Sequence, residues 1–468
     1  MSIVMKFGGT SVADAAALER VANIVAAHRD ERAVVVVSAL SGVTDALLAS
    51  TSIASEQGLN AAIKSLNETF RRHHHAAQQL LPRGPDHFGP YLDNAAVRIA
   101  KLLQTAAGDP ADRRATQDAI VSFGELLSSR LLAEVLNHRG VNAQQVDPRH
   151  CIATNDEYTC AAPLMTETFA KTQQSLLPLL EAGVVPVVGG FIGATREGAT
   201  TTLGRGGSDY TAAILGAALR SEEIQIWTDV TGVLTADPRV VPDAQTIERL
   251  SYSEAAELAY FGAKVLHPKT IQPAIEDRIP VRICNSREPH ERGTLVGPPP
   301  ETSPETSPRT IRAIAHKKGV TTVQITSARM LGAYGFLRAL FEVFDRHRTV
   351  VDVVTTSEVS VSLSLDDDTT LPAIVEELER LGTVRVEKEQ AIICVVGEGL
   401  RGTPGIAARV FSTISDINVT LISQGASSIN FTFAIEETRV EEAVNRLHEA
   451  FFSKQSTLKA GTAGVTPA

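Results

Sequence analysis

The 468-residue sequence contains few cysteines, few aromatic residues and no excess of positive charge. Four cysteines are scattered along it without a CxxC pair, which argues against a disulfide framework or a cysteine zinc site and favours buried free thiols: Cys151, Cys160, Cys284 and Cys394. The 44 Lys and Arg residues against 54 Asp and Glu give a net charge of −10, so no nucleic-acid or anionic-membrane partner is expected. No apolar run approaches a membrane span, and Lys6 with the following glycines interrupts any signal-peptide core. A cytoplasmic enzyme is therefore expected.

A metal-binding motif is also missing. The run His73-His74-His75 lies in a polar helical pattern, and consecutive residues on a helix point in different directions. We interpret the run as part of a solvated helix face.

The stretch Lys6-Phe7-Gly8-Gly9-Thr10-Ser11 stands near the start of the chain, between a short apolar stretch at 3–5 and a helical pattern over 13–27. Adjacent glycines allow backbone N–H groups to approach an anion, and the N-terminus of the next helix favours phosphate. A lysine adds a mobile point charge. The spacing matches neither the Walker A nor the dinucleotide motif, so a phosphate site and a plain αβ turn both stay open.

Up to about residue 296 the sequence alternates between strand-like and helix-like segments. Near-continuous apolar runs at 34–37, 184–192 and 224–227 are typical of strands covered on both faces. The fold class is therefore α/β with a mostly parallel sheet. A long apolar helical stripe is predicted over 117–137, and Glu125 within it is either a functional carboxylate or a solvated helix residue.

The C-terminal third begins after a Pro-, Ser- and Thr-rich linker at 297–310. Shifting the sequence by 70 residues aligns two helical patterns, both predicted to face inward: Leu337, Leu340, Phe341 and Phe344 with Ala407, Val410, Phe411 and Ile414. The same shift aligns alternating strand residues near 359–365 and 429–435. Two copies of one αβ module are predicted, at 311–389 and 390–468.

Three further patches lie within 1–296, the predicted α/β domain. Residues 202–209 are glycine-rich and carry Arg205 and Asp209, residues 228–239 follow a predicted buried strand, and residues 261–264 end in Lys264. Loops at the carboxyl ends of strands are where α/β sheets bind ligands. Two lysines, two arginines and three glycine turns in one unit indicate that it handles polyphosphate.

Four segments resemble the characteristic segments of the aspartokinase family: KFGGTSVAD at 6–14, GRGGSDYT at 204–211, the stretch 228–239 and FGAKVLHP at 261–268. The tandem module resembles the family's two regulatory ACT domains, so the resemblance spans nearly the whole chain. It implies an amino-acid-kinase-like three-layer sandwich followed by two α+β ferredoxin-like ACT modules, between which strand exchange stays open. It also implies the monofunctional, lysine-sensitive type, without a fused homoserine dehydrogenase.

The resemblance implies MgATP-dependent phosphorylation of the L-aspartate side chain to 4-phospho-L-aspartate, the first step towards lysine, threonine and methionine. A carboxylate with a pKa of about 3.9 is already ionised at neutral pH, so this reaction needs positioning and charge relief rather than a general base. Another amino-acid kinase, acting for example on glutamate, and a catalytically inert amino-acid sensor are the alternatives.

The resemblance also implies roles for individual residues. The implied catalytic residues are Lys6, Asp209 and Lys264. The implied ATP-binding residues are Lys6, Phe7, Gly8, Gly9, Thr228, Asp229, Leu234, Arg239, Lys264 and Val265, with Gly8 and Gly9 offering backbone N–H groups. For aspartate, Glu125 is expected to hold the α-ammonium, Arg205 the α-carboxylate and Thr44 a carboxylate oxygen, beside Ser208. Mg²⁺ is expected to arrive on ATP without direct protein ligands.

Feedback regulation is implied for the first module. The implied effector residues are Met330, Gly335, Phe336, Leu337, Val350, Val351, Asp352, Thr356, Ser357 and Glu358. Asp352 and Glu358 offer carboxylates to an ammonium group, which makes lysine the first choice of effector. Val350 replaces a small polar residue common in lysine-sensitive relatives, and this leaves threonine, or lysine plus threonine, open. Because each module is small and open, a homodimer through the ACT modules is expected.

Overall fold

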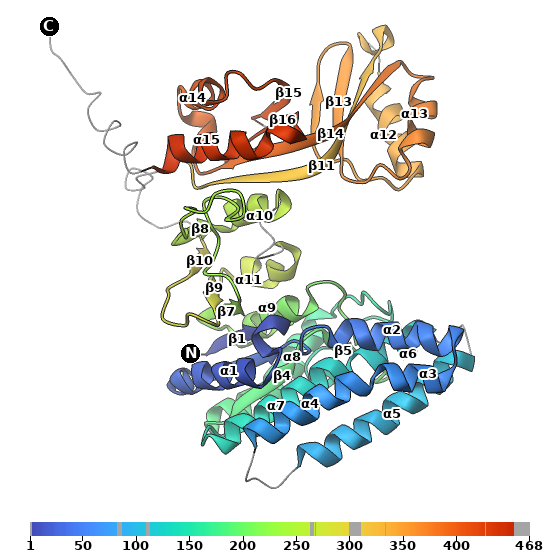
Figure 1. The fold of residues 1–468 in the computed structure, drawn as a ribbon, viewed down its shortest axis with the longest axis vertical. Helices are drawn as coiled ribbons and strands as arrows, with labels where there is room; N and C mark the ends of the chain where they lie inside the picture. Colours follow the sequence, from blue (N-terminus) through green and yellow to red (C-terminus); the bar gives the residue numbers. More distant parts are fainter. Residues whose placement is uncertain are drawn as a thin grey trace, which may run out of the picture. The chain divides into compact units, whose positions relative to one another are not determined.

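The protein is described by a computed structural model covering residues 2–81, 87–108, 113–262, 266, 268–298, 310–332, 334–425 and 427–453 (Figure 1). The chain forms two compact units. The first unit comprises Met1–Val233 and Val265–Pro299, and the second comprises Leu234–Lys264 and Pro300–Ala468. The first unit differs from the predicted domain 1–296 mainly in residues 234–264, which group with the C-terminal part, and it also ends three residues later, at Pro299. Most of the predicted linker 297–310 lies outside the described residues.

The first unit is built on a mostly parallel sheet, as predicted. Its strands follow the order β3-β4-β2-β1-β7-β9-β10, and the β9–β10 pair is antiparallel. Every residue of β2 is buried, because helices cover both faces of the sheet. A separate hairpin pairs β5 with β6. The strand bounds are β1 Ile3–Phe7, β2 Ala33–Val37, β3 Ala143–Val146, β4 Val185–Gly189, β5 Ile192–Ala194, β6 Thr200–Thr202, β7 Glu223–Thr228, β9 Val281–Asn285 and β10 Thr294–Gly297.

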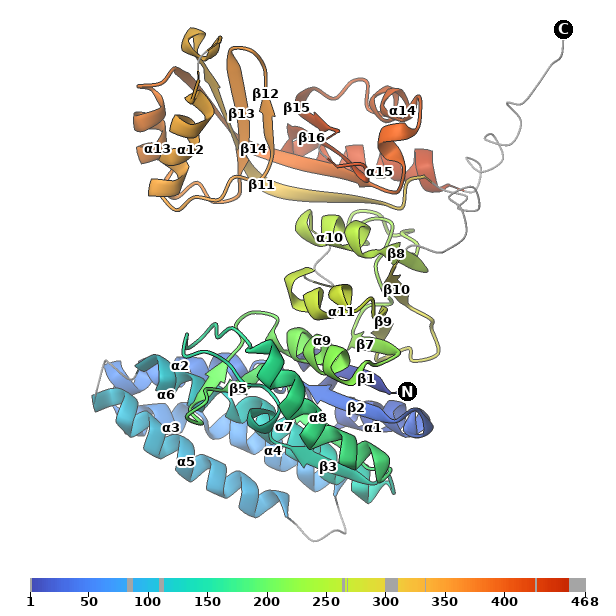
Figure 2. The same cartoon turned by 180° about the vertical axis from the view of Figure 1, so that it is seen from behind.

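Helices form the outer layers of a three-layer sandwich (Figure 2). Met5 and Phe7 share one hydrophobic core with α1, α4, α5 and α7, whereas α9 packs against Val4 on the opposite face. The stripe predicted over 117–137 is divided into α6 and α7 at Ser122. The helix bounds are α1 Ala15–Ala27, α2 Val43–Glu56, α3 Leu59–Ser65, α4 Asn67–Leu80, α5 Phe88–Gly108, α6 Arg113–Val121, α7 Phe123–His138, α8 Met165–Glu181, α9 Gly207–Leu219 and α11 Gln272–Glu276. In the described part of the chain no helix has the length and apolar character to cross a membrane.

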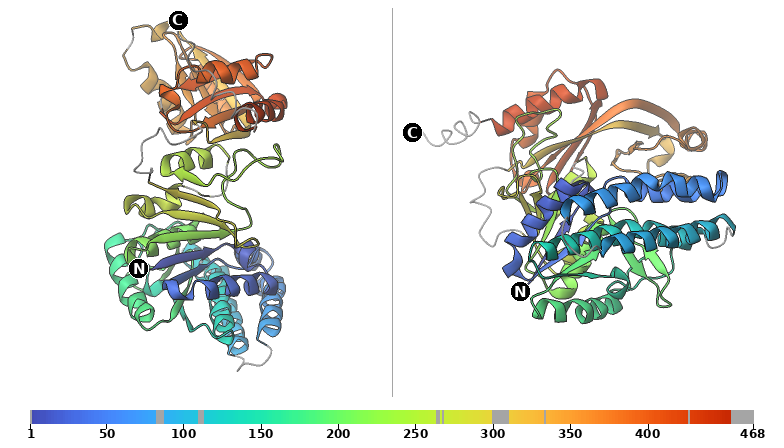
Figure 3. Two further views of the ribbon diagram at one scale, coloured as in Figure 1. Left: turned by 90° about the vertical axis from the view of Figure 1, so that its left-hand side faces the viewer. Right: turned by 60° about the horizontal axis from the view of Figure 1, so that its bottom comes forward.

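The second unit contains one antiparallel sheet shared by both modules (Figure 3). Its six strands follow the order β12-β13-β11-β14-β16-β15. Their bounds are β11 Ala313–Thr326, β12 Val354–Thr356, β13 Ser360–Leu365, β14 Thr383–Val396, β15 Val419–Gln424 and β16 Asn430–Glu436. The remaining elements are β8 Arg249–Ser251, α10 Tyr252–Tyr260, α12 Phe336–Arg346, α13 Leu371–Leu378, α14 Ile406–Thr413 and α15 Val440–Phe452.

Strands β11 and β14 run through both modules. The first half of β11, Ala313–Lys317, pairs with the end of β14, whereas its second half pairs with the start of β14 and with β13. Ile311 and Ile314 accordingly belong to the hydrophobic core of the second module. The modules therefore exchange a strand, and the boundary predicted at 389/390 falls inside β14.

The predicted inner face of α12 needs a correction. Leu340, Val343 and Phe344 are buried in the core of the first module, but Leu337 and Phe341 are 41% and 37% exposed. The apolar stripe is wider than the face that packs on the sheet, so part of it remains at the surface of the single chain.

The predicted solvated histidine face is wrong for one residue. His73 on α4 is fully buried, and burial lowers its pKa to about 4, whereas His74 and His75 are exposed. The predicted buried thiols are found for three cysteines, while Cys160 is exposed. Within the described ranges, no group of three or more His, Cys, Asp or Glu side chains is arranged to hold a metal ion.

Candidate active site

The carboxyl ends of parallel strands meet at one edge of the first unit's sheet. Lys6 in β1 lies beside Val36 in β2 on one side and beside Ile226 in β7 on the other. The loops that follow β1, β2 and β7 therefore leave the sheet next to one another, at the edge where α/β folds bind ligands.

Lys6 and Asp209 are brought together at this edge. Lys6 Nζ lies 2.6 Å from Asp209 Oδ1, and the two side chains are only 11% and 20% exposed. Asp209 stands in the first turn of α9, where the helix dipole favours a carboxylate. The ion pair holds the ammonium group of Lys6 in a defined place.

The two glycines after Lys6 have different roles. The N–H of Gly8 donates to the carbonyl of Trp227 at 3.2 Å, so the prediction that Gly8 offers its N–H to phosphate is wrong: the pairing of β1 with β7 continues one residue past the strand. The N–H of Gly9 donates to no residue that the structure describes. A Cβ on Gly9 would lie 3.1 Å from the carbonyl oxygen of Ala39, so the loop after β2 would have to move by a few tenths of an ångström to admit a side chain at this position.

Glu125 stands in the first turn of α7 and contacts the loop after β2. It is only 4% exposed, and its Oε1 accepts a hydrogen bond from the N–H of Ala39 at 3.2 Å. Its Oε2 is buried without a partner, and burial raises the pKa of the carboxyl to about 8. This rules out the alternative of a solvated helix residue. A buried, unpaired carboxylate oxygen is suited to receive an ammonium group.

Two consecutive glycines at the end of β4 let the backbone come close to the side chains of Glu125 and Ser208. A Cβ on Gly189, at the end of β4, would lie 3.1 Å from Glu125 Cβ. A Cβ on Gly190 would lie 2.6 Å from Ser208 Cβ, which leaves no room for one. Ser208, next to Asp209 in α9, is thereby placed beside the end of β4. Glu125 lies beside Gly189, the residue that precedes Gly190 in the chain.

The remaining predicted substrate residues are available for a ligand. Thr44 stands in the first turn of α2, after Gly42 with its φ of 77°. Arg205 is exposed and makes no hydrogen bond or ion pair with any described residue. A free guanidinium at this position can bind a carboxylate in bidentate fashion.

The predicted nucleotide residues are divided among several places. Thr228 and Asp229 follow β7 at the sheet edge, and the Thr228 hydroxyl donates to Asp229 at 3.2 Å. Leu234 and Arg239 belong to the second unit, where Arg239 pairs with Asp237 and is 84% exposed. Lys264 and Val265 lie outside the described residues, so their predicted roles stay predictions.

Two serines at this edge have a structural role that the sequence did not predict. Ser11 Oγ lies 3.0 Å from Ser286 Oγ, and Ser286 also donates to the carbonyl of Thr228 through its N–H at 2.8 Å and its hydroxyl at 3.0 Å. Ser286 directly follows β9, so its place after a buried parallel strand was the signal available. These hydrogen bonds fix the start of the loop that carries Asp229.

The predicted effector residues lie around one end of the first module. Met330 ends a short helical turn, and Gly335, Phe336 and Leu337 form the start of α12. Val350 is 74% exposed and Val351 half-buried. Thr356, Ser357 and Glu358 are exposed at the turn between β12 and β13.

Asp352 is the most enclosed of the effector residues. It accepts a hydrogen bond from the Tyr260 hydroxyl, and its Oδ2 lies 3.7 Å from Lys317 Nζ. Burial raises the pKa of its carboxyl. The Ser357 hydroxyl, by contrast, stabilises the turn between β12 and β13, because it accepts a hydrogen bond from the N–H of Ser360 at 3.1 Å. Among the described residues, Asp352 Oδ2 accepts no hydrogen bond and Glu358 makes no hydrogen bond or ion pair, so these two carboxylates are the candidates for binding a cationic effector.

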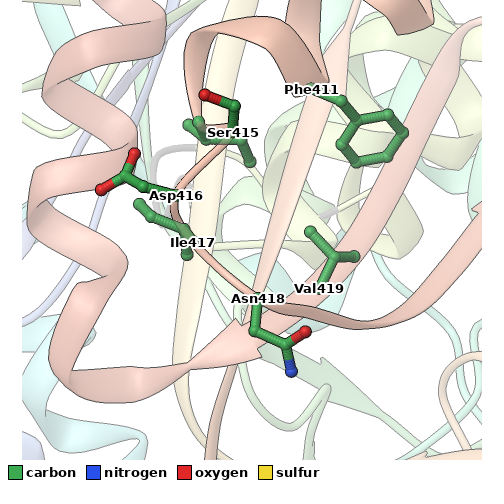
Figure 4. A pocket seen from close by; sticks show the side chains of 7 residues that line it. Phe411, Ser415, Asp416, Ile417, Asn418 and Val419 are labelled. Carbon is green, nitrogen blue, oxygen red and sulfur yellow. The ribbon is translucent and has the colours of Figure 1, made fainter.

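The second module has a hollow of about 420 Å³ next to the C-terminal end of α14, away from the residues that correspond to the predicted effector segments (Figure 4). Its lining residues are Phe411, Ile414, Ser415, Asp416, Ile417, Asn418 and Val419. Asp416 is the acidic residue among them, and it pairs with Arg439 and Arg446. These ion pairs therefore engage the acidic side chain of this hollow.

The chain is similar to known proteins over nearly its whole length. A family model for the amino acid kinase family matches residues 1–285, and one for the ACT domain matches residues 393–451. Lysine-sensitive aspartokinase 3 of Escherichia coli is 39% identical over 459 residues, which cover 96% of this chain and 99% of that protein. The chloroplastic aspartokinase 3 of Arabidopsis thaliana is 39% identical over 469 residues, covering 97% of this chain and 82% of that protein.

Solved structures give the same result. The chain resembles E. coli aspartokinase III in complex with aspartate and ADP with a TM-score of 0.80, at 38% identity over 97% of this chain and 100% of that one. It resembles the same enzyme in complex with lysine and aspartate with a TM-score of 0.81, at the same identity and coverage.

Proposed function

Because the chain belongs to the aspartokinase family, we propose that it transfers the γ-phosphoryl group of ATP to the side-chain carboxylate of L-aspartate. The product is 4-phospho-L-aspartate. One arrangement carries this proposal: a lysine held by Asp209 and a buried carboxylate with an unpaired oxygen, Glu125, lie at the same sheet edge. The first matches a transferring phosphoryl group, and the second matches the ammonium group of an amino acid.

Each side chain has a role that follows from its chemistry. Glu125 binds the α-ammonium group and Arg205 the α-carboxylate, and together they direct the side-chain carboxylate of the substrate towards the phosphate. Lys6 stabilises the charge that develops on the transferring group, and the free N–H of Gly9 donates to a phosphate oxygen. Two anions must meet in this reaction, so positioning and charge relief supply the rate enhancement.

Mg²⁺ is proposed to arrive with ATP and to neutralise charge on its phosphates. This ion usually binds through one or two protein carboxylates, substrate phosphates and water. Asp209 is committed to Lys6 at 2.6 Å, so the ion is proposed to be held by the phosphates of ATP and by water, without a direct protein ligand.

The substrate assignment is tested with the hydroxamate assay for acyl phosphates, using L-aspartate and L-glutamate in parallel. Aspartate is expected to give product and glutamate is not, because the longer side chain displaces the reacting carboxylate. Product from glutamate alone would assign the chain to another amino-acid kinase. The absence of product from both would support the inert sensor.

We also propose that lysine inhibits the enzyme by binding to the first module. Asp352 and Glu358 supply carboxylates for its two ammonium groups, and an E. coli relative has been solved with lysine. Exposed Val350 offers no hydrogen bond there, so threonine remains the second candidate. Titrating activity with lysine, with threonine and with both distinguishes these effectors. Inhibition by threonine alone would contradict the lysine assignment.

A homodimer through the first module is proposed as well. Exposed apolar side chains gather on it, and a second copy would bury them: Leu331, Tyr334, Leu337, Phe341 and Val350. Sedimentation is expected to show a dimer that Phe341→Glu shifts towards monomer. Leu177→Glu, at an exposed leucine of the first unit, is the matched control. A monomeric wild type at micromolar concentration would refute the dimer.

A further inference from the structure

Two loops of the proposed site lie against each other, and among the described residues only their starting points are tied together directly, by the hydrogen bond from the N–H of Ser38 to the carbonyl of Phe7 at 3.0 Å. The glycine loop, residues 8–13, follows β1, and the serine loop, residues 38–43, follows β2. They touch at Gly9, where a Cβ would lie 3.1 Å from the Ala39 oxygen and 3.7 Å from Ser41 Cα. Both loops lie within the described residues, and no hydrogen bond joins one directly to the other.

One side chain bridges the two loops. Arg72, on α4, donates from Nη1 to the carbonyl of Ser41 at 2.9 Å and from Nη2 to the carbonyl of Ala13 at 3.0 Å. The guanidinium is planar and its donors are fixed relative to one another. Its two acceptors are therefore held at a set separation, which a lysine with a single nitrogen would not reproduce.

Arg72 itself is firmly placed. The face of α4 next to it is buried in the core through His73, Ala76 and Leu80. Arg72 is half-buried and forms no ion pair with any acidic side chain in the described ranges, so its donors are committed to these main-chain carbonyls. The neighbouring Arg71 differs in both respects, because it is 73% exposed and pairs with Glu68 on the same helix.

Arg72 connects the two loops that are proposed to hold the two reactants. The glycine loop begins two residues after Lys6, and the serine loop leads into Thr44 and is held from below by Glu125 through Ala39. We propose that Arg72 is a positioning residue, which sets the spacing between the phosphoryl-binding loop and the aspartate-binding loop. This inference rests on the proposed function for the roles of the two loops.

Loss of the bridge is expected to lower kcat more than it raises KM. Each loop keeps its own ligand contacts, so binding survives, but the in-line approach of the carboxylate to phosphorus depends on their spacing. A misplacement of about 1 Å can cost about 100-fold in rate. Arg72→Ala is therefore expected to lower kcat by about 10- to 100-fold.

The test compares Arg72→Ala, Arg72→Lys and the control Arg71→Ala. We expect Arg72→Lys to recover part of kcat through one carbonyl, and Arg71→Ala to match wild type. Methylguanidinium is expected to restore activity to Arg72→Ala, and methylammonium at the same concentration is not. Equal kcat for the two alanine variants, or no response of Arg72→Ala to methylguanidinium, would overturn the inference.

Amide hydrogen exchange tests the bridge separately from catalysis. Residues 8–13 and 38–43 are expected to exchange faster in Arg72→Ala than in Arg71→Ala, with the rest of the first unit unchanged. Unchanged exchange in both loops would overturn the inference. A wild type that does not phosphorylate aspartate would instead overturn the proposed function, and the exchange comparison would still decide the role of Arg72.

Discussion

The titration of Glu125 gives the sharpest prediction about substrate binding. Burial raises the pKa of its carboxyl from 4.5 to about 8, so in the free enzyme about one tenth of it is ionised at pH 7 and about one hundredth at pH 6. An ammonium group binds to the ionised form. Because kcat/KM reports the free enzyme, kcat/KM for aspartate is expected to fall about 10-fold between pH 7 and pH 6.

Glu125→Gln is the corresponding perturbation. It keeps an acceptor for the N–H of Ala39 but cannot ionise, so kcat/KM is expected to be low and to lose its slope between pH 6 and pH 8. Glu134→Gln, which removes the partner of Arg130 on the same helix, is expected to keep the slope. A wild-type profile that is flat over this range, or a Gln variant with the same slope, would refute the role of Glu125.

The same carboxyl makes folding depend on pH. Its pKa is higher in the folded state, so the folded state binds more protons, and the free energy of unfolding falls as pH rises from 4.5 towards 8. Glu125→Gln removes this dependence. Without ligand, the stability of the variant relative to wild type is expected to increase by about 3 kcal/mol between pH 5 and pH 8, as measured by urea unfolding. A difference in stability between variant and wild type that stays constant from pH 5 to pH 8 would show that folding does not raise the pKa of Glu125.

Other perturbations separate the remaining parts of the site. Gly9→Ala is expected to lower kcat, because its Cβ would press on the serine loop. Gly8→Ala is expected to be tolerated, because its Cβ would lie 3.6 Å from Lys6 Nζ, an ordinary contact distance. Equal kcat values for the two variants would contradict this. Asp209→Asn leaves the lysine ammonium without its partner and is expected to lower kcat by about 100-fold, and a wild-type rate would exclude a role for the ion pair. Tyr260→Phe releases the enclosed carboxylate of the effector segment, so lysine is expected to inhibit at about 2- to 10-fold lower concentration, which an unchanged inhibition curve would refute.

The sheet and its ligand-binding edge followed from local patterns. Runs such as Val34–Val37 are apolar throughout because both faces of β2 are covered, and this property is visible in four residues. Once the strands are parallel, their carboxyl ends share an edge, and the loops after them come together. The pairing of Lys6 with Asp209, far apart in the sequence, follows from that topology and from the resemblance to a family.

Other features depended on tertiary contacts with no local pattern. The use of the Gly8 N–H by Trp227 and the bridging role of Arg72 each depend on where a distant carbonyl lies. His73 is different, because Thr69, His73, Ala76 and Leu80 do recur with helical spacing along one buried face. The burial of His73 is therefore visible in this periodicity, whereas the run of three histidines alone does not indicate it.

The extent of the helix stripe in the first module was also beyond sequence patterns. Leu337 and Phe341 share the apolar periodicity of α12, yet the single chain leaves both exposed while Leu340 and Phe344 fill the core. A pattern shows which residues are apolar, but it does not show whether their partner is the same chain or a second copy.

A crystal structure with L-aspartate and a non-hydrolysable ATP analogue tests the central claim most directly. The α-ammonium group of aspartate is predicted within about 3 Å of Glu125 Oε2, and Lys6 Nζ within about 3 Å of a γ-phosphate oxygen. Aspartate bound with its ammonium group away from Glu125, or a γ-phosphate beyond the reach of Lys6, would contradict the account.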